Sequence, residues 1–299
     1  MKNYSDNVNH VSKLAIGDPD NMSSEGIEPL RKGSIPRNNF FKKLFLDLAP
    51  VFLVITVWEV IARLVMYTKE TPFPTPVITF KRLMELLAGT LFLQHTLYSH
   101  LVSSLSRWSV GLVFGVIFGI TAGMIIGRSR LYERIAMPVV YILQLIPGLA
   151  WIPIAILLFG IGEGATIFII FIIALVPVVI NMVTGIRGID EAYIKTAQMM
   201  GAKTRTIFFQ VLLPGAAPHL LSGLRIAVGS SWRVLIAAEM VVGSGSGLGY
   251  SIIQARWNLD YASSFVCIIA ICFIGLVVEK VFFERIELLS VKRWGIVNS

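Results

Sequence analysis

The sequence predicts an all-α membrane protein with six transmembrane helices. Hydrophobic residues make up 55% of the 299 residues and charged residues only 15%, whereas a soluble domain carries about a quarter charged residues. The apolar residues also gather in runs long enough to cross a bilayer, which takes about 20 residues. We expect the six spans at residues 44–67, 101–127, 135–160, 165–185, 219–242 and 264–283.

The basic residues predict the orientation of the chain. The net charge is +8, but the lysines and arginines lie between apolar runs, which is typical of cytoplasmic loops and not of a nucleic-acid surface. They concentrate in residues 1–44, 128–134, 186–218 and 285–299. We therefore expect the chain in a bacterial inner membrane, with both termini on the cytoplasmic side. The polar residues 1–40 are predicted to be a disordered tail, and residues 41–299 the membrane domain.

The first predicted span and the segment after it hold charges and prolines. Glu59 and Arg63 are four residues apart on one helical face, where they can neutralise each other. They form either a charged lining of a pathway or, as we favour, a structural pair that faces the bundle interior. Residues 68–92 include three prolines within five residues, which predict an extended crossing and not a helix.

The second and third predicted spans carry different packing signals. The second has a glycine at every fourth residue from Gly111 to Gly127, a ridge that lets a neighbouring helix approach closely. The third contains Pro138, Pro147 and Pro153 and is predicted to bend or break at each of them. The freed carbonyls need partners in protein or in a wet cavity, so this span is predicted to line a pathway.

Five residues are candidates for the lining of that pathway. Gln144 and Trp151 flank the middle proline of the third span, Pro147, which is itself a candidate. Arg233 and Glu239 lie in the fifth span, where charges are costly and usually functional. An arginine there could donate hydrogen bonds to an anion. The alternatives stay open, because Glu239 could instead pair within the bundle.

Residues 186–218 form an internal stretch with both charge and an amphipathic pattern. We expect a helix over 191–200, a stop at Gly201, and a second helix that ends at Pro214. Three interpretations remain open. The stretch could rest on lipid, it could be a loop without function, or it could lay its apolar face in a groove of a partner protein.

The spacing in this stretch resembles a cytoplasmic motif of the inner-membrane permeases of ATP-binding-cassette importers. That motif reads Glu-Ala-Ala, three residues, Gly, nine residues, then Ile-x-Leu-Pro. The corresponding residues here are Lys195, Thr196, Ala197, Gly201, Val211, Leu213 and Pro214. Lys195 replaces the family's acidic residue and Thr196 an alanine, so the ion pair of the first turn departs from the family pattern.

Other segments resemble the branch of these permeases that handles nitrate, sulfonates, taurine and related molecules. They are residues 74–76, 146–153, 160–163, 223–227, 237–240, 247–250 and 293–295. The resemblance covers residues 45–295. It implies the transmembrane domain of a type I ABC importer, with a MetI-like fold.

The resemblance also implies partners and a function. Two copies of the permease, as a homodimer, would form the pathway, two cytoplasmic ATPases would bind ATP and magnesium and grip residues 186–218, and an external binding protein would deliver the solute. The chain has no Gly-x-x-x-x-Gly-Lys-Ser/Thr loop, so we expect no cofactor, metal or enzymatic activity in it. The expected solute is a small anion such as an aliphatic sulfonate, taurine or nitrate. The alternatives are bicarbonate, a pyrimidine or thiamine precursor, or, in another class, an autonomous ion-coupled transporter.

Overall fold

The computed structural model describes residues 37–283, and within them every named element is a helix. The chain forms two units, residues 1–54 and 55–299. In the first unit the described part is the start of α2 (Arg37–Lys69), which continues into the second unit. The predicted tail lies outside the described residues except for its last four, which begin α2.

The second unit contains a series of long spans joined by short helices. In chain order they are α3 (Pro76–Leu87), α4 (Leu97–Arg128), α5 (Arg130–Leu145), η2 (Gly148–Trp151), α6 (Ile152–Phe159), α7 (Glu163–Arg187), α8 (Glu191–Met199), α9 (Thr204–Ile207), η3 (Phe208–Leu212), α10 (Leu213–Val242), α11 (Leu248–Trp257), α12 (Tyr261–Val277) and η4 (Val278–Phe283). Among the described residues, five helices are long and apolar enough to cross a membrane, and the bent pair of α5 with η2–α6 makes a sixth. The predicted all-helical membrane fold with six spans is confirmed.

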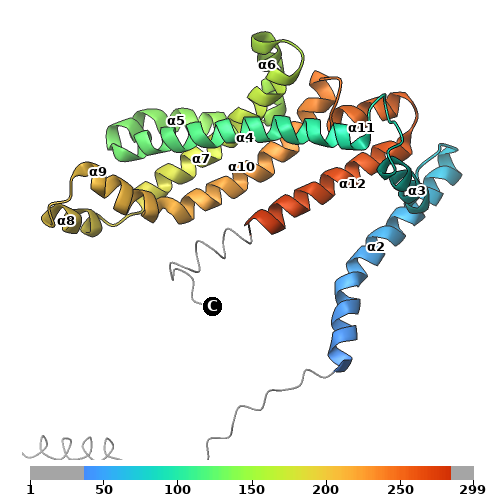
Figure 1. The fold of residues 1–299 in the computed structure, drawn as a ribbon, viewed down its shortest axis with the longest axis horizontal. Helices are drawn as coiled ribbons and strands as arrows, with labels where there is room; N and C mark the ends of the chain where they lie inside the picture. The colour runs from blue at the N-terminus through green and yellow to red at the C-terminus, as the bar shows by residue number, and fades with distance from the viewer. Residues whose placement is uncertain (1–36, 284–299) are drawn as a thin grey trace, which may run out of the picture. The chain divides into compact units, whose positions relative to one another are not determined.

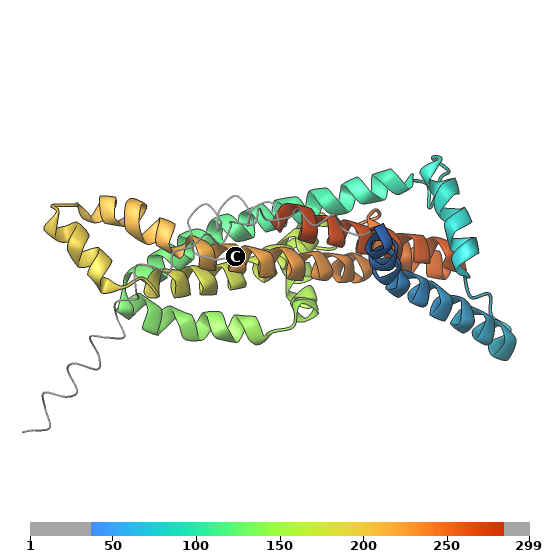
Figure 2. The same ribbon diagram turned by 90° about the horizontal axis from the view of Figure 1, so that it is seen from below.

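The glycine ridge joins α4 to α7 at the centre of the unit. Helices α4, α7 and α10 run side by side (Figure 1), and a view turned by 90° agrees (Figure 2). A Cβ atom added at Gly115 would lie 2.7 Å from the Cβ of Ala174, and one at Gly123 would lie 2.6 Å from the Cβ of Met182. Real Cβ atoms do not approach so closely, so only glycine allows this helix separation. The predicted packing role of the ridge is confirmed.

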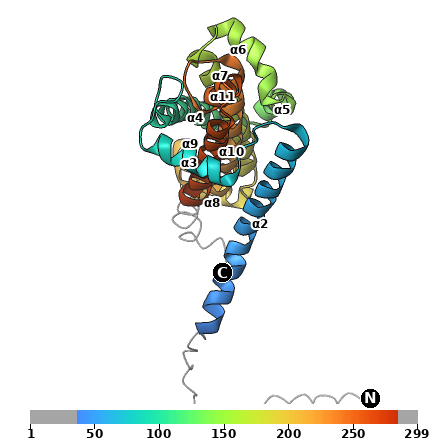
Figure 3. The ribbon, with the colours of Figure 1, turned by 90° about the vertical axis from the view of Figure 1, so that its right-hand side faces the viewer.

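The third span is broken once. Helix α5 and the η2–α6 helix are bent by 102° at Pro147, and Figure 3 shows α6 turning away from α5. Pro138 lies inside the continuous α5, and Pro153 lies in the first turn of α6. A proline in a first turn removes no helical hydrogen bond, because the amide there has no intrahelical partner. The predicted bend or break is confirmed at Pro147, whereas Pro153 begins a helix and does not break one, and α5 continues through Pro138 without a break.

The proline-rich segment after the first span is not extended throughout. Helix α3 begins at Pro76, and Thr75 caps it by accepting a hydrogen bond from the Ile78 amide at 3.3 Å. The fixed φ of proline suits the first helical position, so the last proline of the segment starts a helix. The prediction of an extended crossing over residues 68–92 is corrected accordingly.

Candidate functional site

The segment with the importer motif forms α8 and, after Gly201, α9, which together we call the helix pair. Asp190 caps α8, and its carboxylate accepts a hydrogen bond from the Ala192 amide at 2.9 Å. Helix α8 ends at Met199, and Gly201 follows with φ +79°. That left-handed conformation favours glycine, since it brings a Cβ atom into conflict with the backbone. The predicted helix and its glycine stop are confirmed.

The sequence predicted that the second helix of this pair ends at Pro214, but the helix continues past this residue. Residues Thr204–Val242 form one helix of 39 residues that passes through the π-helical turn η3. The Leu213 amide bonds to the Phe208 carbonyl, one residue further back than in an α-helix, and Pro214 then lies in the first turn of α10. The wider π turn accommodates the proline. Helix α9 is therefore continuous with a membrane span.

The other motif residues lie on both sides of Gly201. Lys195 and Thr196 are exposed, and Ala197, Val211 and Leu213 are half-buried. Lys195 Nζ lies 3.3 Å from Glu191 Oε2, one turn earlier in α8. The basic residue at the family's acidic position thus pairs within its own helix, and both partners are about two-thirds exposed, so the pair contributes only about 0.3–0.5 kcal/mol.

The helix pair, with the turn after α8 and the η3 turn after α9, exposes four large apolar side chains. They are Tyr193, Met199, Met200 and Phe209, with exposed fractions of 67%, 82%, 82% and 54%. Large apolar side chains that stay exposed are available for contact with a partner or with lipid, and methionine adapts readily to a partner's shape.

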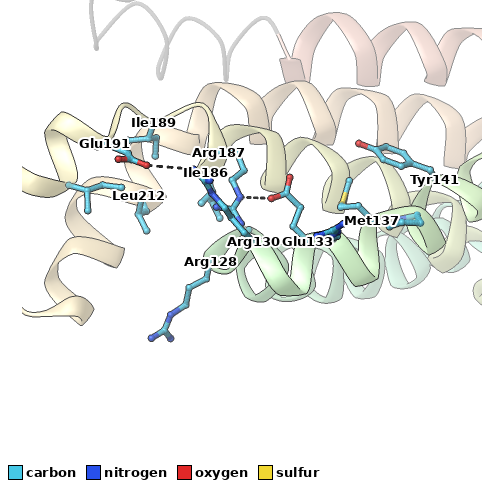
Figure 4. Close-up of a pocket in the computed structure, with 14 residues that line it drawn as sticks. Arg128, Arg130, Glu133, Met137, Tyr141, Ile186, Arg187, Ile189, Glu191 and Leu212 are labelled. Carbon is cyan, nitrogen blue, oxygen red and sulfur yellow. Dashed lines mark ion pairs between the residues drawn. The ribbon is translucent and has the colours of Figure 1, made fainter.

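A cavity of about 620 Å³ lies between this helix pair and the ends of the spans. In its wall Arg187 Nε donates to Glu133 Oε2 at 2.7 Å, and Arg130 Nη2 lies 3.7 Å from Glu191 Oε1, as Figure 4 shows. The first pair links the last turn of α7 to the first turn of α5, and the second links α5 to α8. Helix α8 thus has one exposed ion-pair contact with α5, and α5 is in turn paired with α7.

A second polar cluster, which the sequence analysis missed, surrounds Arg107 of α4. Its side chain is 2% exposed. Nη1 donates to Glu239 Oε1 at 2.7 Å and to the Ser246 carbonyl at 2.9 Å. Nη2 donates to Ser246 Oγ at 2.8 Å and to Glu163 Oε1 at 3.2 Å. One guanidinium thus joins α4, α7, α10 and the loop between α10 and α11.

The Glu239 carboxylate is held by further groups of the same chain. Ser104 Oγ lies 2.9 Å from both of its oxygens, and the Gly249 amide donates to Oε2 at 2.9 Å. Ser104 in turn accepts from the Leu248 amide at 2.8 Å. These partners bury the carboxylate completely. The carboxylate therefore pairs within the bundle and holds the start of α11, which is the alternative left open for Glu239. It has no exposed surface for the predicted lining of a pathway.

His100 also holds the glycine-rich loop between α10 and α11, through a hydrogen bond to Gly247. His100 Nδ1 accepts a hydrogen bond from the Gly247 amide at 3.2 Å, and its Nε2 lies 3.2 Å from the Phe92 carbonyl. A neutral ring with its proton on Nε2 satisfies both contacts. His100, Ser104 and Arg107 precede Gly111 on the buried face of α4. This spacing was the available signal, because a polar side chain in line with a packing ridge is buried and needs a partner.

The remaining candidates for a pathway lining lie on separate elements. Gln144 and Pro147 are exposed at the end of α5, and Arg233 is exposed on α10. Trp151 is half-buried, and its Nε1 has no hydrogen-bond partner within the described part of the chain. Their role in a pathway stays a prediction.

Residues 115–283 match the protein family described as "Binding-protein-dependent transport system inner membrane component". The chain belongs to this family. It is 31% identical over 232 residues to the taurine transport system permease protein of Escherichia coli, covering 77% of this chain and 84% of that protein. It is 30% identical over 261 residues to the nitrate import permease protein of Synechocystis, covering 85% of this chain and 91% of that protein.

This binding-protein-dependent permease is also 32% identical over 238 residues to the bicarbonate transport system permease protein of Synechococcus elongatus, covering 78% of this chain and 84% of that protein. Its fold agrees with a solved structure as well. An inward-facing chain of the MetNI methionine ABC transporter matches with a TM-score of 0.55 at 22% identity, over 69% of this chain and 96% of that chain. The expected MetI-like fold is confirmed.

Proposed function

We propose that this permease forms the translocation pathway of an ATP-driven importer for a small oxyanion, such as an aliphatic sulfonate, taurine, nitrate or bicarbonate. Taurine, nitrate and bicarbonate are the solutes in the names of the similar permeases. Each of them carries a compact anionic group with two or three oxygens. That shared chemistry supports an anion pathway and leaves the individual solute to the binding protein.

The observation that carries the proposal is the set of exposed apolar side chains on α8 and η3, on either side of the glycine turn. An amphipathic helix recognises a partner by laying its apolar face into a groove. The residues that would dock are Lys195, Thr196, Ala197 and Gly201 on the exposed helix pair. Val211, Leu213 and Pro214 would carry the movement into α10, because the helix is continuous there.

The proposed assembly contains two copies of this permease, two ATPases and an external binding protein. The ATPases would bind ATP and magnesium and drive the cycle. Arg128, Arg130 and Arg187 lie at the end of the spans that carries α8, and basic residues favour the cytoplasmic side. These arginines support our proposal that the helix pair and both termini lie on the cytoplasmic side of a bacterial inner membrane, with the glycine-rich loop on the outer side.

The contacts of the permease suggest how a cycle would use it. When the ATPases close, α8 and α9 would move together, and α10 would follow as the same helix. The Arg187–Glu133 pair would move α7 and α5 with them. The Arg107 cluster would hold the opposite ends of α4, α7 and α10 together while the cytoplasmic ends shift.

The proposal is tested by reconstitution of the permease in proteoliposomes, with and without its cassette ATPase and its binding protein. Uptake of labelled taurine, nitrate and bicarbonate is measured with ATP inside or outside the vesicles. We expect uptake of at least one of the three that requires both partners and ATP on the ATPase side. Uptake by the permease alone, driven by an ion gradient, would instead identify an ion-coupled transporter.

A further inference from the structure

A cavity of about 500 Å³ lies between α10 and α12, away from the helix pair. Arg225, Trp232 and Arg233 line it from α10, and Gly275 and Glu279 line it from α12 and η4. This cavity brings two arginines of α10 against a neighbouring span. The charged groups of its lining are two guanidinium groups and one carboxylate.

Arg233 lies deep within its span. It precedes the end of α10 at Val242 by nine residues, about 14 Å along the helix at 1.5 Å per residue. The residue is exposed, and among residues 37–283 no hydrogen bond or ion pair holds its guanidinium. A charge at that depth is costly against lipid and is found facing water or a charged ligand.

Two glycines keep the space beside this guanidinium open. Gly229 precedes Arg233 by one turn, and a Cβ atom there would lie 3.7 Å from Arg233 Nη1. Gly275 lies across the cavity, and a Cβ atom there would lie 3.4 Å from Trp232 Nε1. A larger side chain at either position would fill part of the cavity.

The chemistry of the cavity selects a class of ligand. A guanidinium group presents paired N–H donors in one plane, which match two oxygens of a carboxylate, nitrate, carbonate or sulfonate. Trp232 supplies an apolar wall, since its own Nε1 already lies 3.4 Å from the Ile271 carbonyl as a donor. Glu279 adds a negative charge, which disfavours more highly charged anions.

We infer that this cavity is an intramembrane binding site for a small oxyanion, with the Arg233 guanidinium as the donor. The inference rests on the proposed function, because it takes the solute to pass along α10. It adds that selectivity for an anionic head group lies partly in the permease and not only in a binding protein.

The test uses the complete transporter, reconstituted with its ATPase and binding protein, and measures ATP-driven uptake of taurine, nitrate and bicarbonate. The variants are Arg233→Gln and Arg233→Lys. Arg256→Gln, an exposed arginine of α11, is the control. For the transported probe we expect Arg233→Gln to lower uptake by about tenfold or more. Arg233→Lys should lower it less, because it keeps the charge but loses the paired donors, and the control should match the wild type.

Co-purification of the ATPase shows whether each variant is assembled. If Arg233→Gln fails to assemble, Gly275→Val replaces it, since that change narrows the cavity from α12 and leaves the arginine in place. If the wild type takes up a probe and an assembled cavity variant takes it up equally well, the binding site is overturned and the proposed function stands. Absence of wild-type uptake of all three probes instead overturns the proposed function itself.

Discussion

Arg107 and Glu239 form an ion pair of 2.7 Å in which both side chains are almost fully removed from solvent. They lie on different spans, α4 and α10, and are separated by more than a hundred positions in the sequence. Arg107 also binds the loop between α10 and α11 through Ser246, and Glu239 binds the first turn of α11 through Gly249. The pair therefore fixes two helix ends and a loop in one arrangement.

The first prediction concerns this ion pair. Arg107→Met leaves the Glu239 carboxylate buried without its main partner, and breaking a buried pair in this way costs about 3–5 kcal/mol. We expect a clear fall in the thermal unfolding temperature of the purified permease in detergent. The double variant Arg107→Met/Glu239→Met should recover part of the loss, because it removes both charges.

The control for this prediction is an exposed pair. Arg63 Nε lies 2.7 Å from Glu59 Oε1, and the arginine side chain is 76% exposed. Arg63→Met should cost much less than Arg107→Met, because this pair is not buried within the protein. Equal unfolding temperatures for Arg63→Met and Arg107→Met would contradict a stabilising role for the buried cluster.

The second prediction concerns the glycine ridge. Gly115→Ala places a methyl group 2.7 Å from Ala174 Cβ and 2.9 Å from the Phe171 carbonyl, so α4 and α7 must separate. Overpacking of this kind costs about 1–3 kcal/mol. Adding Ala174→Gly should restore part of the stability, since it removes one of the two contacts. Gly164→Ala is the control, with an ordinary contact of 3.4 Å to Phe159 Cβ, and a larger effect there would refute the assignment.

The third prediction separates coupling from folding. At Gly201 a Cβ atom meets nothing within 4 Å, but the residue has φ +79°. Gly201→Glu should therefore insert and purify normally, with a local strain of about 1–2 kcal/mol, while uptake per ATP hydrolysed falls severalfold. The measurement is ATPase activity and uptake on the same proteoliposomes.

Gly89→Glu is the matched control for Gly201→Glu. Gly89 also has a left-handed conformation, with φ +91° and open space around its Cα, but it follows α3 and lies outside the importer motif. It should keep the wild-type ratio of uptake to hydrolysis. An unchanged ratio in Gly201→Glu, at equal protein level, would remove the support for a coupling role.

The fourth prediction concerns the glycine-rich loop. Gly247 has φ +122°, and a Cβ atom there would meet the Glu239 carboxylate. Gly247→Ala should release the loop, and a cysteine placed at Ser244 should then react faster with a water-soluble maleimide in a Cys272→Ser background. Gly245→Ala, which is strained but meets no neighbour, is the control. If Gly247→Ala and Gly245→Ala both make the cysteine react faster, the effect comes from backbone strain alone.

Local patterns explain why so much of the fold was predictable. Hydropathy located the spans, and the four-residue glycine spacing identified the face of α4 that packs on α7. The glycine stop after α8 was also visible, because one residue in a left-handed conformation ends a helix. The same local view misjudged Pro76 and Pro214, since a proline can begin a helix or follow a π turn as well as end a helix.

The sequence by itself determined the membrane-spanning class, the order of the helices and the importer motif around Gly201. Only the tertiary structure decided that Arg107 meets Glu239 and that Arg233 faces a cavity. The reason is physical. Hydrophobic periodicity and backbone preference act over one or two turns, whereas the partner of a buried charge is chosen by helices that pack together from distant parts of the chain.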